Sequence, residues 1–176
     1  MSDLHVLYVC TANICRSPYM ELLSRHRLAE QEGASVTFAS AGTHGFVDKQ
    51  MNRVMAATLE AGIPHRQFRS RHLDRDMIDS ADLVLTAERS HRQFVLEEHP
   101  SAFRKVYTLG QFAEVVRRSA PTLSGRELIA AASQISGITQ LKADIPDPFS
   151  RGTEAADVCA AQIGELLDVV LPALTR

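Results

Sequence analysis

Four short apolar segments recur along the chain, each bounded by polar or turn-forming residues, at Leu4–Val9, Ser35–Ser40, Ala81–Thr86 and Lys105–Leu109. Runs of roughly four to eight residues rich in Val, Leu and aromatic side chains are typical of buried strands. The pattern therefore predicts four strands.

Apolar residues spaced three and four positions apart, as on one face of a helix, fill the intervals between these strands. The first helix is expected to begin with Ser17 as its N-cap and Pro18 at its first position. It should run to about Gln31, with Gly33 as its stop signal. Further helices are expected over Asn52–Glu60, Glu88–Glu98, Phe112–Arg118 and Arg126–Ile135, and from about Thr153 onward.

Strands that alternate with helices predict an α/β fold with a parallel sheet covered on both faces. Right-handed crossovers then place the carboxyl ends of the strands along one edge, where open α/β sheets bind ligands. Cys10 lies at such an end. The 176 residues show no composition shift, so we expect a single domain over residues 1–176.

Composition argues against several classes of protein. A net charge of -2, with 23% charged and 45% hydrophobic residues, is ordinary for a soluble protein and does not favour a nucleic-acid or membrane partner. The N-terminus lacks the basic segment of a signal peptide, and no apolar run approaches the length that spans a bilayer. The 3 cysteines cannot all pair, which favours a reducing, cytoplasmic location.

The loop Cys10–Pro18, CTANICRSP, joins the first strand to the first helix. Its backbone N–H groups and the helix N-terminus converge on one spot, which suits an anion. Arg16 adds a planar guanidinium that matches the oxygens of phosphate, sulfate or arsenate. The same donors favour a thiolate at Cys10, and a thiolate beneath a bound phosphate is an in-line nucleophile. The loop thus predicts phosphoryl transfer through a phosphocysteine, with no metal and no cofactor.

This loop resembles the signature of the low-molecular-weight protein tyrosine phosphatases, in which a Cys is followed by five residues, an Arg, and a Ser or Thr. The resemblance continues at Ser40–Thr43, Gly62–Pro64, Arg71–Thr86 and Asp147–Phe149. It implies a three-layer fold with a four-stranded parallel sheet, of the phosphotyrosine phosphatase I type. The helical segment at about 112–143 is longer than the family usually has.

The resemblance implies three catalytic residues. Cys10 would be the nucleophile, and Arg16 would bind the phosphate and stabilise the transition state. Asp147 would protonate the leaving tyrosine oxygen and then activate water, since one carboxyl group can serve both half-reactions. The alternative for Asp147 is a turn residue before Pro148.

Supporting roles follow from the same resemblance. Ser17 would hydrogen-bond the thiolate, and Asn13 would hold the strained loop backbone with help from Ser40. Cys15 would either pack the loop or form a reversible disulfide with the nucleophile. Substrate contacts are expected from Thr11, Ala12, Asn13, Ile14, Cys15, Ser17 and Phe149.

Three departures from the family pattern stand out. Ala12 replaces a common glycine, Phe149 is a lone aromatic where two are frequent, and Ala87-Glu88 replaces a frequent Met-Asp. None of the three is expected to touch the catalytic trio.

Three alternatives compete with a tyrosine phosphatase. A protein-arginine phosphatase of the same fold tends to carry threonine where this chain has Ile14, whose bulk suits an aromatic ring better. An arsenate reductase needs two further cysteines near mid-chain, and none lies between Val36 and Val158. A silent phosphotyrosine-binding module would be expected to have lost Cys10 or Asp147.

The expected partner is a phosphotyrosine-containing protein, for which family analogy suggests a bacterial tyrosine kinase. The sequence leaves the oligomeric state open. The segment at about 112–143 would cover the active-site rim, form a dimer contact or pad the sheet.

Overall fold

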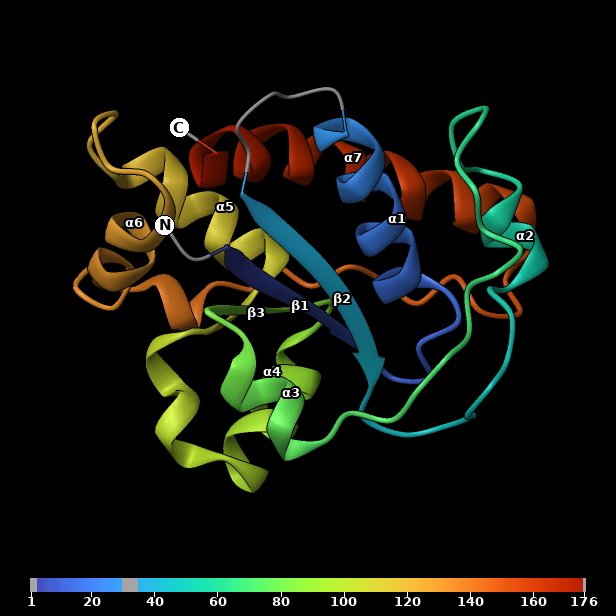
Figure 1. The fold of residues 1–176 in the computed structure, drawn as a ribbon, viewed down its shortest axis with the longest axis horizontal. Coiled ribbons are helices and arrows are strands. Elements are labelled where there is room, and N and C mark those ends of the chain that lie inside the picture. Colours follow the sequence, from blue (N-terminus) through green and yellow to red (C-terminus); the bar gives the residue numbers. More distant parts are fainter. Residues whose placement is uncertain (1–2, 30–34, 176) are drawn as a thin grey trace.

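A parallel sheet forms the middle layer of the computed structural model, which describes residues 3–29 and 35–175 (Figure 1). Its strands are β1 (Leu4–Cys10), β2 (Val36–Gly42), β3 (Leu83–Thr86) and β4 (Val106–Thr108), in the order β2-β1-β3-β4. All three pairings are parallel. The expectation of a four-stranded parallel sheet is confirmed.

Helices cover both faces of the sheet (Figure 1). They are α1 (Arg16–Leu28), α2 (Arg53–Ala56), α3 (Arg75–Ser80), α4 (Arg89–Glu98), α5 (Leu109–Arg118), α6 (Gly125–Ala132) and α7 (Gly152–Thr175), with short 3-10 turns η1 (Pro100–Arg104) and η2 (Ile138–Gln140). The larger core lies between the sheet and α1, α5, α6 and α7, and the smaller core lies under α3, α4 and η1. The fold therefore has three layers.

Strand β1 shows why the chain folds this way. Val6 and Tyr8 point into the larger core, while Leu7 and Val9 point into the smaller one. Both faces are buried, so the strand is apolar almost throughout. The crossover from β1 to β2 runs through α1 on one face, and the crossover from β2 to β3 runs through α3 on the other. β2 and β3 thus lie on opposite sides of β1, and the connections diverge at its carboxyl end. Open α/β sheets form their ligand crevice at such a point.

The start of α1 differs from the expectation. The helix begins at Arg16 with Cys15 at the N-cap, so Ser17 is not the cap. Ser17 is instead fully buried in the first turn, where its hydroxyl contacts other side chains. The helix ends at Leu28, and the expected end near Gln31 and the stop at Gly33 lie outside the described residues.

Four more helices differ from the expectation. α5 begins at Leu109 rather than Phe112, α6 ends at Ala132 rather than Ile135, α2 is shorter than expected and α3 was not expected at all. α2 has only 4 residues, because after Asn52 caps its start the Thr58 hydroxyl bonds the Met55 carbonyl at 2.8 Å and the chain turns away. α3, over Arg75–Ser80, was missed in a stretch dominated by charge, although Asp74 caps it by accepting from the Met77 N–H at 2.8 Å.

The segment at 112–143 packs beside the sheet. Phe112 and Val115 of α5 and Leu128 of α6 are buried in the larger core. The buried amide of Gln111 donates to the carbonyls of Thr139 and Leu141 at 3.2 Å each, which fastens η2 to α5. Among the described residues, none from this segment lines the pocket at the end of β1. Of the three alternatives for this segment, its contacts therefore match packing against the sheet.

Helix α7 is long and apolar enough, by length and composition alone, to cross a membrane. This corrects the expectation that no segment approaches that length. Half of its most apolar stretch is buried inside the protein, where Ile163, Leu167 and Val170 pack into the larger core. α7 contacts α1, α2, α5 and α6, while Val158 near its start is exposed.

Candidate active site

The loop from Cys10 to Cys15 curls between the end of β1 and the start of α1. Its outward carbonyls are held by the segment after β2: the Thr43 N–H donates to the Cys10 carbonyl at 2.9 Å and the His44 N–H to the Thr11 carbonyl at 2.8 Å. A Cβ at Gly42 would lie 2.6 Å from the Thr11 carbonyl oxygen. Only glycine fits there, which explains the close approach of β2 to the loop.

Asn13 stabilises an unusual backbone turn in this loop. Its φ of 54° is in the left-handed region. The buried side-chain amide donates to the hydroxyls of Ser17 and Ser40 at 2.8 Å each, and its oxygen accepts from the Arg71 N–H at 3.0 Å. These are the contacts expected of a residue that holds the loop, and they include Ser40.

Cys10 is buried and lines the pocket, with its sulfur 3.0 Å from the Ser17 hydroxyl oxygen. That oxygen already accepts from the Asn13 amide. The Ser17 proton can therefore turn to the sulfur, where it would stabilise a thiolate.

Arg16 is almost completely buried, with 1% of its surface exposed. Its Nη1 donates to the carboxylate of Glu88 and to the carbonyl of Ile145 at 2.8 Å. Its Nη2 lies 3.2 Å from a carboxylate oxygen of Asp147. Its Nε is buried with no hydrogen-bond partner among the described residues. A buried donor without a partner is costly, so this edge of the guanidinium is suited to an anion in the pocket.

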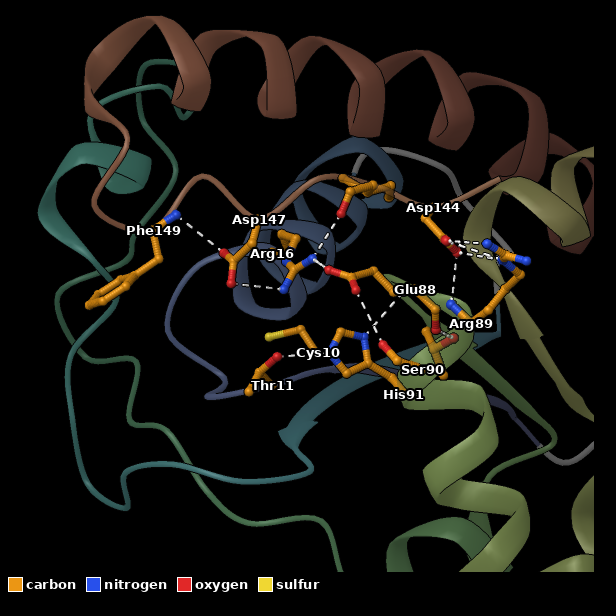
Figure 2. Close-up of polar contacts among 12 residues, drawn as sticks. Cys10, Thr11, Arg16, Glu88, Arg89, Ser90, His91, Asp144, Asp147 and Phe149 are labelled. Carbon is orange, nitrogen blue, oxygen red and sulfur yellow. Dashed lines mark hydrogen bonds and ion pairs between the residues drawn. The ribbon is translucent and has the colours of Figure 1, made fainter. Parts of the chain in front are cut away.

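Glu88 is a site residue that the sequence interpretation missed, and it corrects an expectation. The Ala87-Glu88 departure does touch the expected catalytic trio, because the Glu88 carboxylate pairs with the Arg16 guanidinium (Figure 2). Burial opposes ionisation of Glu88, but the hydrogen bond and charge of Arg16 outweigh it and hold the pKa of Glu88 below its usual range. The pair holds the guanidinium at Nη1, the nitrogen that also donates to the Ile145 carbonyl.

Replacing Glu88 with glutamine should destabilise the fold, since it leaves the buried charge of Arg16 without its close counterion. We expect a loss of about 2 kcal/mol in the free energy of unfolding, below the roughly 3–5 kcal/mol of a fully broken pair because Asp147 and the Ile145 carbonyl remain. Denaturant titration measures it. Glu98→Gln, at the exposed end of the same helix, is the matched control. Equal stability of both variants would contradict the role of Glu88.

The loop Asp144–Ser150 brings Asp147 to the pocket from far along the chain. The Ile145 N–H donates to the Ala87 carbonyl at 2.9 Å, at the end of β3. Asp144 accepts from the Arg89 backbone N–H at 2.8 Å and pairs with its guanidinium. Both contacts are made just before Asp147, so they hold its carboxyl beside Arg16 (Figure 2).

Asp147 also makes a turn, as the alternative interpretation expects. Its Oδ1 accepts from the Phe149 N–H at 3.2 Å, while its Oδ2 faces Arg16. The turn and the contact with Arg16 use different oxygens. The two interpretations of Asp147 are therefore compatible.

The pocket above Cys10 has about 440 Å³ of open space. Besides Cys10 and Arg16 it is lined by Thr11, Ala12, Ile14, Cys15, Phe46, Asp147 and Phe149. Phe149 and Phe46 are 50% and 55% exposed, so two aromatic rings stand at the rim. Phe46, in the loop after β2, was missed because nothing in its sequence surroundings indicates a binding role. It provides a second aromatic where Phe149 was expected to be alone.

The three cysteines are free thiols, and all three are buried. Burial raises the pKa of Cys15 to about 12 and that of Cys159 to about 12. Cys15 lines the same pocket as Cys10, whereas Cys159 packs in the larger core. Among the described residues, no three His, Cys, Asp or Glu side chains gather as they would around a metal ion.

Comparison with known proteins places this chain in a family. Residues 5–124 match the family of low molecular weight phosphotyrosine protein phosphatases. The chain is 33% identical over 108 residues to a protein-arginine-phosphatase of Bacillus subtilis, spanning 61% of this chain and 71% of that protein. It is 37% identical over 111 residues to the low molecular weight protein-tyrosine-phosphatase Etp of Escherichia coli, spanning 62% and 71%.

Among solved structures, the YwlE arginine phosphatase from Geobacillus stearothermophilus superposes with a TM-score of 0.75 at 27% identity, covering 97% of this chain and 92% of that one. The family match covers well over half of the chain. The chain therefore belongs to the low-molecular-weight phosphotyrosine protein phosphatase family. It is an enzyme of the hydrolase class that removes phosphoryl groups from proteins.

Proposed function

We propose that this enzyme hydrolyses phosphotyrosine in proteins through a covalent phosphocysteine. The observation that carries the proposal is the buried Arg16, which lines the same pocket as Cys10 and whose Nε has no hydrogen-bond partner among the described residues. A phosphate held by the guanidinium and the loop N–H groups would present its phosphorus to Cys10.

The chemistry divides into two steps. The Cys10 thiolate attacks phosphorus as the bond to the tyrosine oxygen breaks, and Asp147 gives that oxygen its proton. Asp147 then takes a proton from water, which attacks the phosphocysteine and releases phosphate and the thiolate. The Ser17 hydroxyl, 3.0 Å from the sulfur, stabilises the thiolate at the start and at the end. These two steps require no oxidant, reductant or metal.

The apolar walls of the pocket support an aromatic substrate. Ile14, Phe46 and Phe149 offer surfaces against which a phenyl ring can pack. The pocket is open enough to admit a phosphotyrosine side chain presented by a protein, for which a bacterial tyrosine kinase is a candidate.

A second candidate is hydrolysis of phosphoarginine. It is favoured by the protein-arginine-phosphatases among the relatives, one of which is 33% identical. Against it stands Ile14, an apolar side chain where a guanidinium needs polar neighbours. An assay of phosphotyrosine, phosphoarginine and phosphoserine peptides side by side tests the proposal, and a clear preference for phosphoarginine would overturn it.

Changing Ile14 to threonine should move the preference towards phosphoarginine. We expect kcat/KM for a phosphotyrosine peptide to fall about tenfold, since lost apolar contact in a pocket costs roughly 1–3 kcal/mol. Ile14→Val, which keeps an apolar wall, is the control. Unchanged ratios of the two activities in Ile14→Thr would remove Ile14 from substrate selection.

We further propose a cytoplasmic location and a redox guard at Cys15. Its thiol lines the pocket with Cys10 and is protonated at neutral pH. Peroxide would oxidise Cys10 to the sulfenic acid, and the Cys15 sulfur would displace water to form a disulfide that cellular thiols reduce. A reducing cytoplasm suits an enzyme whose nucleophile must be a free thiol.

A further inference from the structure

A histidine outside the expected site contacts the phosphate loop. His91, in the first turn of α4, is 5% exposed. Its Nε2 lies 2.8 Å from the Thr11 hydroxyl oxygen, and its Nδ1 lies 3.1 Å from the Glu88 backbone nitrogen (Figure 2). One imidazole therefore joins the start of α4 to the residue next to Cys10.

The two contacts determine the position of the ring proton. The Glu88 N–H can only donate, so Nδ1 must accept and carries no proton. Burial and the charge of Arg16 lower the pKa of His91 to about 4, so the ring is neutral at working pH. The single ring proton is then on Nε2, which donates to the Thr11 oxygen.

That donation orients the Thr11 hydroxyl. Of the described residues, His91 is the hydrogen-bond partner of this hydroxyl, and Thr11 is an exposed residue that lines the pocket together with Cys10. Because its oxygen accepts from His91, its own proton is free to point away from α4. Since Thr11 lines the same pocket as Cys10 and Arg16, an anion bound there can accept this proton.

We infer that the Thr11 hydroxyl is a phosphate-binding donor and that His91 is the positioning residue that orients it. The inference rests on the proposed function, in that the anion is a phosphoryl group. The α4 cap thus acts on the pocket twice: Glu88 holds Arg16, and His91 holds Thr11. No proton is transferred, since Thr11 contributes a hydrogen bond to a phosphoryl oxygen in both half-reactions.

The role of the Thr11 hydroxyl is tested with inorganic phosphate. Its binding to the intact chain is measured by calorimetry. Thr11→Val keeps the shape but removes the donor and should weaken phosphate binding about tenfold, the value of one hydrogen bond to a charged group. Thr11→Ser keeps the hydroxyl and should stay within about threefold of the unaltered chain. Equal affinity of Thr11→Val and the unaltered chain would overturn the inference.

The role of His91 is tested by two variants that separate its two contacts. His91→Asn keeps an acceptor near Nδ1 for the helix cap but cannot reach Thr11, so it should fold normally and lose phosphate affinity about as Thr11→Val does. His91→Gln can place an amide donor near Nε2 and should restore the affinity. The double variant Thr11→Val/His91→Asn should bind no worse than Thr11→Val alone.

Two outcomes contradict the positioning role. Equal losses in His91→Asn and His91→Gln would show that His91 acts only through α4, and additive losses in the double variant would show that the two side chains act separately. Phosphate binding requires no turnover. A chain that fails to hydrolyse phosphotyrosine but shows this pattern would refute the proposed function and leave the inference intact.

Discussion

Replacing Cys10 with serine should abolish hydrolysis of p-nitrophenyl phosphate, with a fall in kcat of at least about 10⁴-fold. The sulfur at the end of β1 has the Ser17 hydroxyl as its hydrogen-bond partner, 3.0 Å away. That contact stabilises an anion but cannot remove a proton from a serine hydroxyl. The variant therefore lacks both an ionised nucleophile and a base to create one.

The same variant should still bind inorganic phosphate, because Arg16 and the backbone N–H groups of the loop are unchanged. Calorimetry on Cys10→Ser measures this. Cys159→Ala, a change of a buried thiol in the larger core, is the control and should keep its activity. Full activity in Cys10→Ser, or loss of activity in Cys159→Ala at unchanged stability, would contradict the assignment of the nucleophile.

The strands and their parallel arrangement were predictable because burial on both faces leaves a plain trace in the sequence. Leu4–Cys10 and Leu83–Thr86 are apolar almost throughout, and each is followed by a turn. Helix ends were harder to predict, since they depend on side-chain caps such as Thr58 on the Met55 carbonyl. The short α3 carries a charged exposed face and buries only Ile78, so its periodicity is weak.

The site residues also fall into those that could be predicted from the sequence and those that could not. The residues of the loop are neighbours in sequence, so Cys10 and Arg16 could be recognised together from one short motif. Glu88 and His91 did not, because their roles depend on the register that places the end of β3 beside the end of β1. One signal was present: a Glu and a His three positions apart after an apolar strand can form a reciprocal helix cap. Phe46 left no such signal.

Changing Asp147 to asparagine should slow the enzyme in a way that depends on the leaving group. Phenyl phosphate releases a basic phenolate that needs a proton, so kcat/KM should fall about 10²–10³-fold, the range of general acid catalysis. p-Nitrophenolate leaves without help, so with p-nitrophenyl phosphate the loss should be roughly tenfold or less. Asparagine can still accept the Phe149 N–H, so the turn before Pro148 should persist.

A matched change lies three residues earlier in the same loop. Asp144→Asn weakens the ion pair with Arg89, but the new amide oxygen can still accept the Arg89 backbone N–H that helps to hold the loop. The Asp147 carboxyl is retained, so any loss should be equal for both substrates. The ratio of the two activities, rather than either rate alone, therefore shows whether Asp147 acts as the general acid. If Asp147→Asn lowers both activities equally, its carboxylate acts only through Arg16, 3.2 Å away, and the proton must come from another group. An unequal loss confined to Asp147→Asn would instead locate the proton donor on the loop that Ala87 and Arg89 hold against the end of β3.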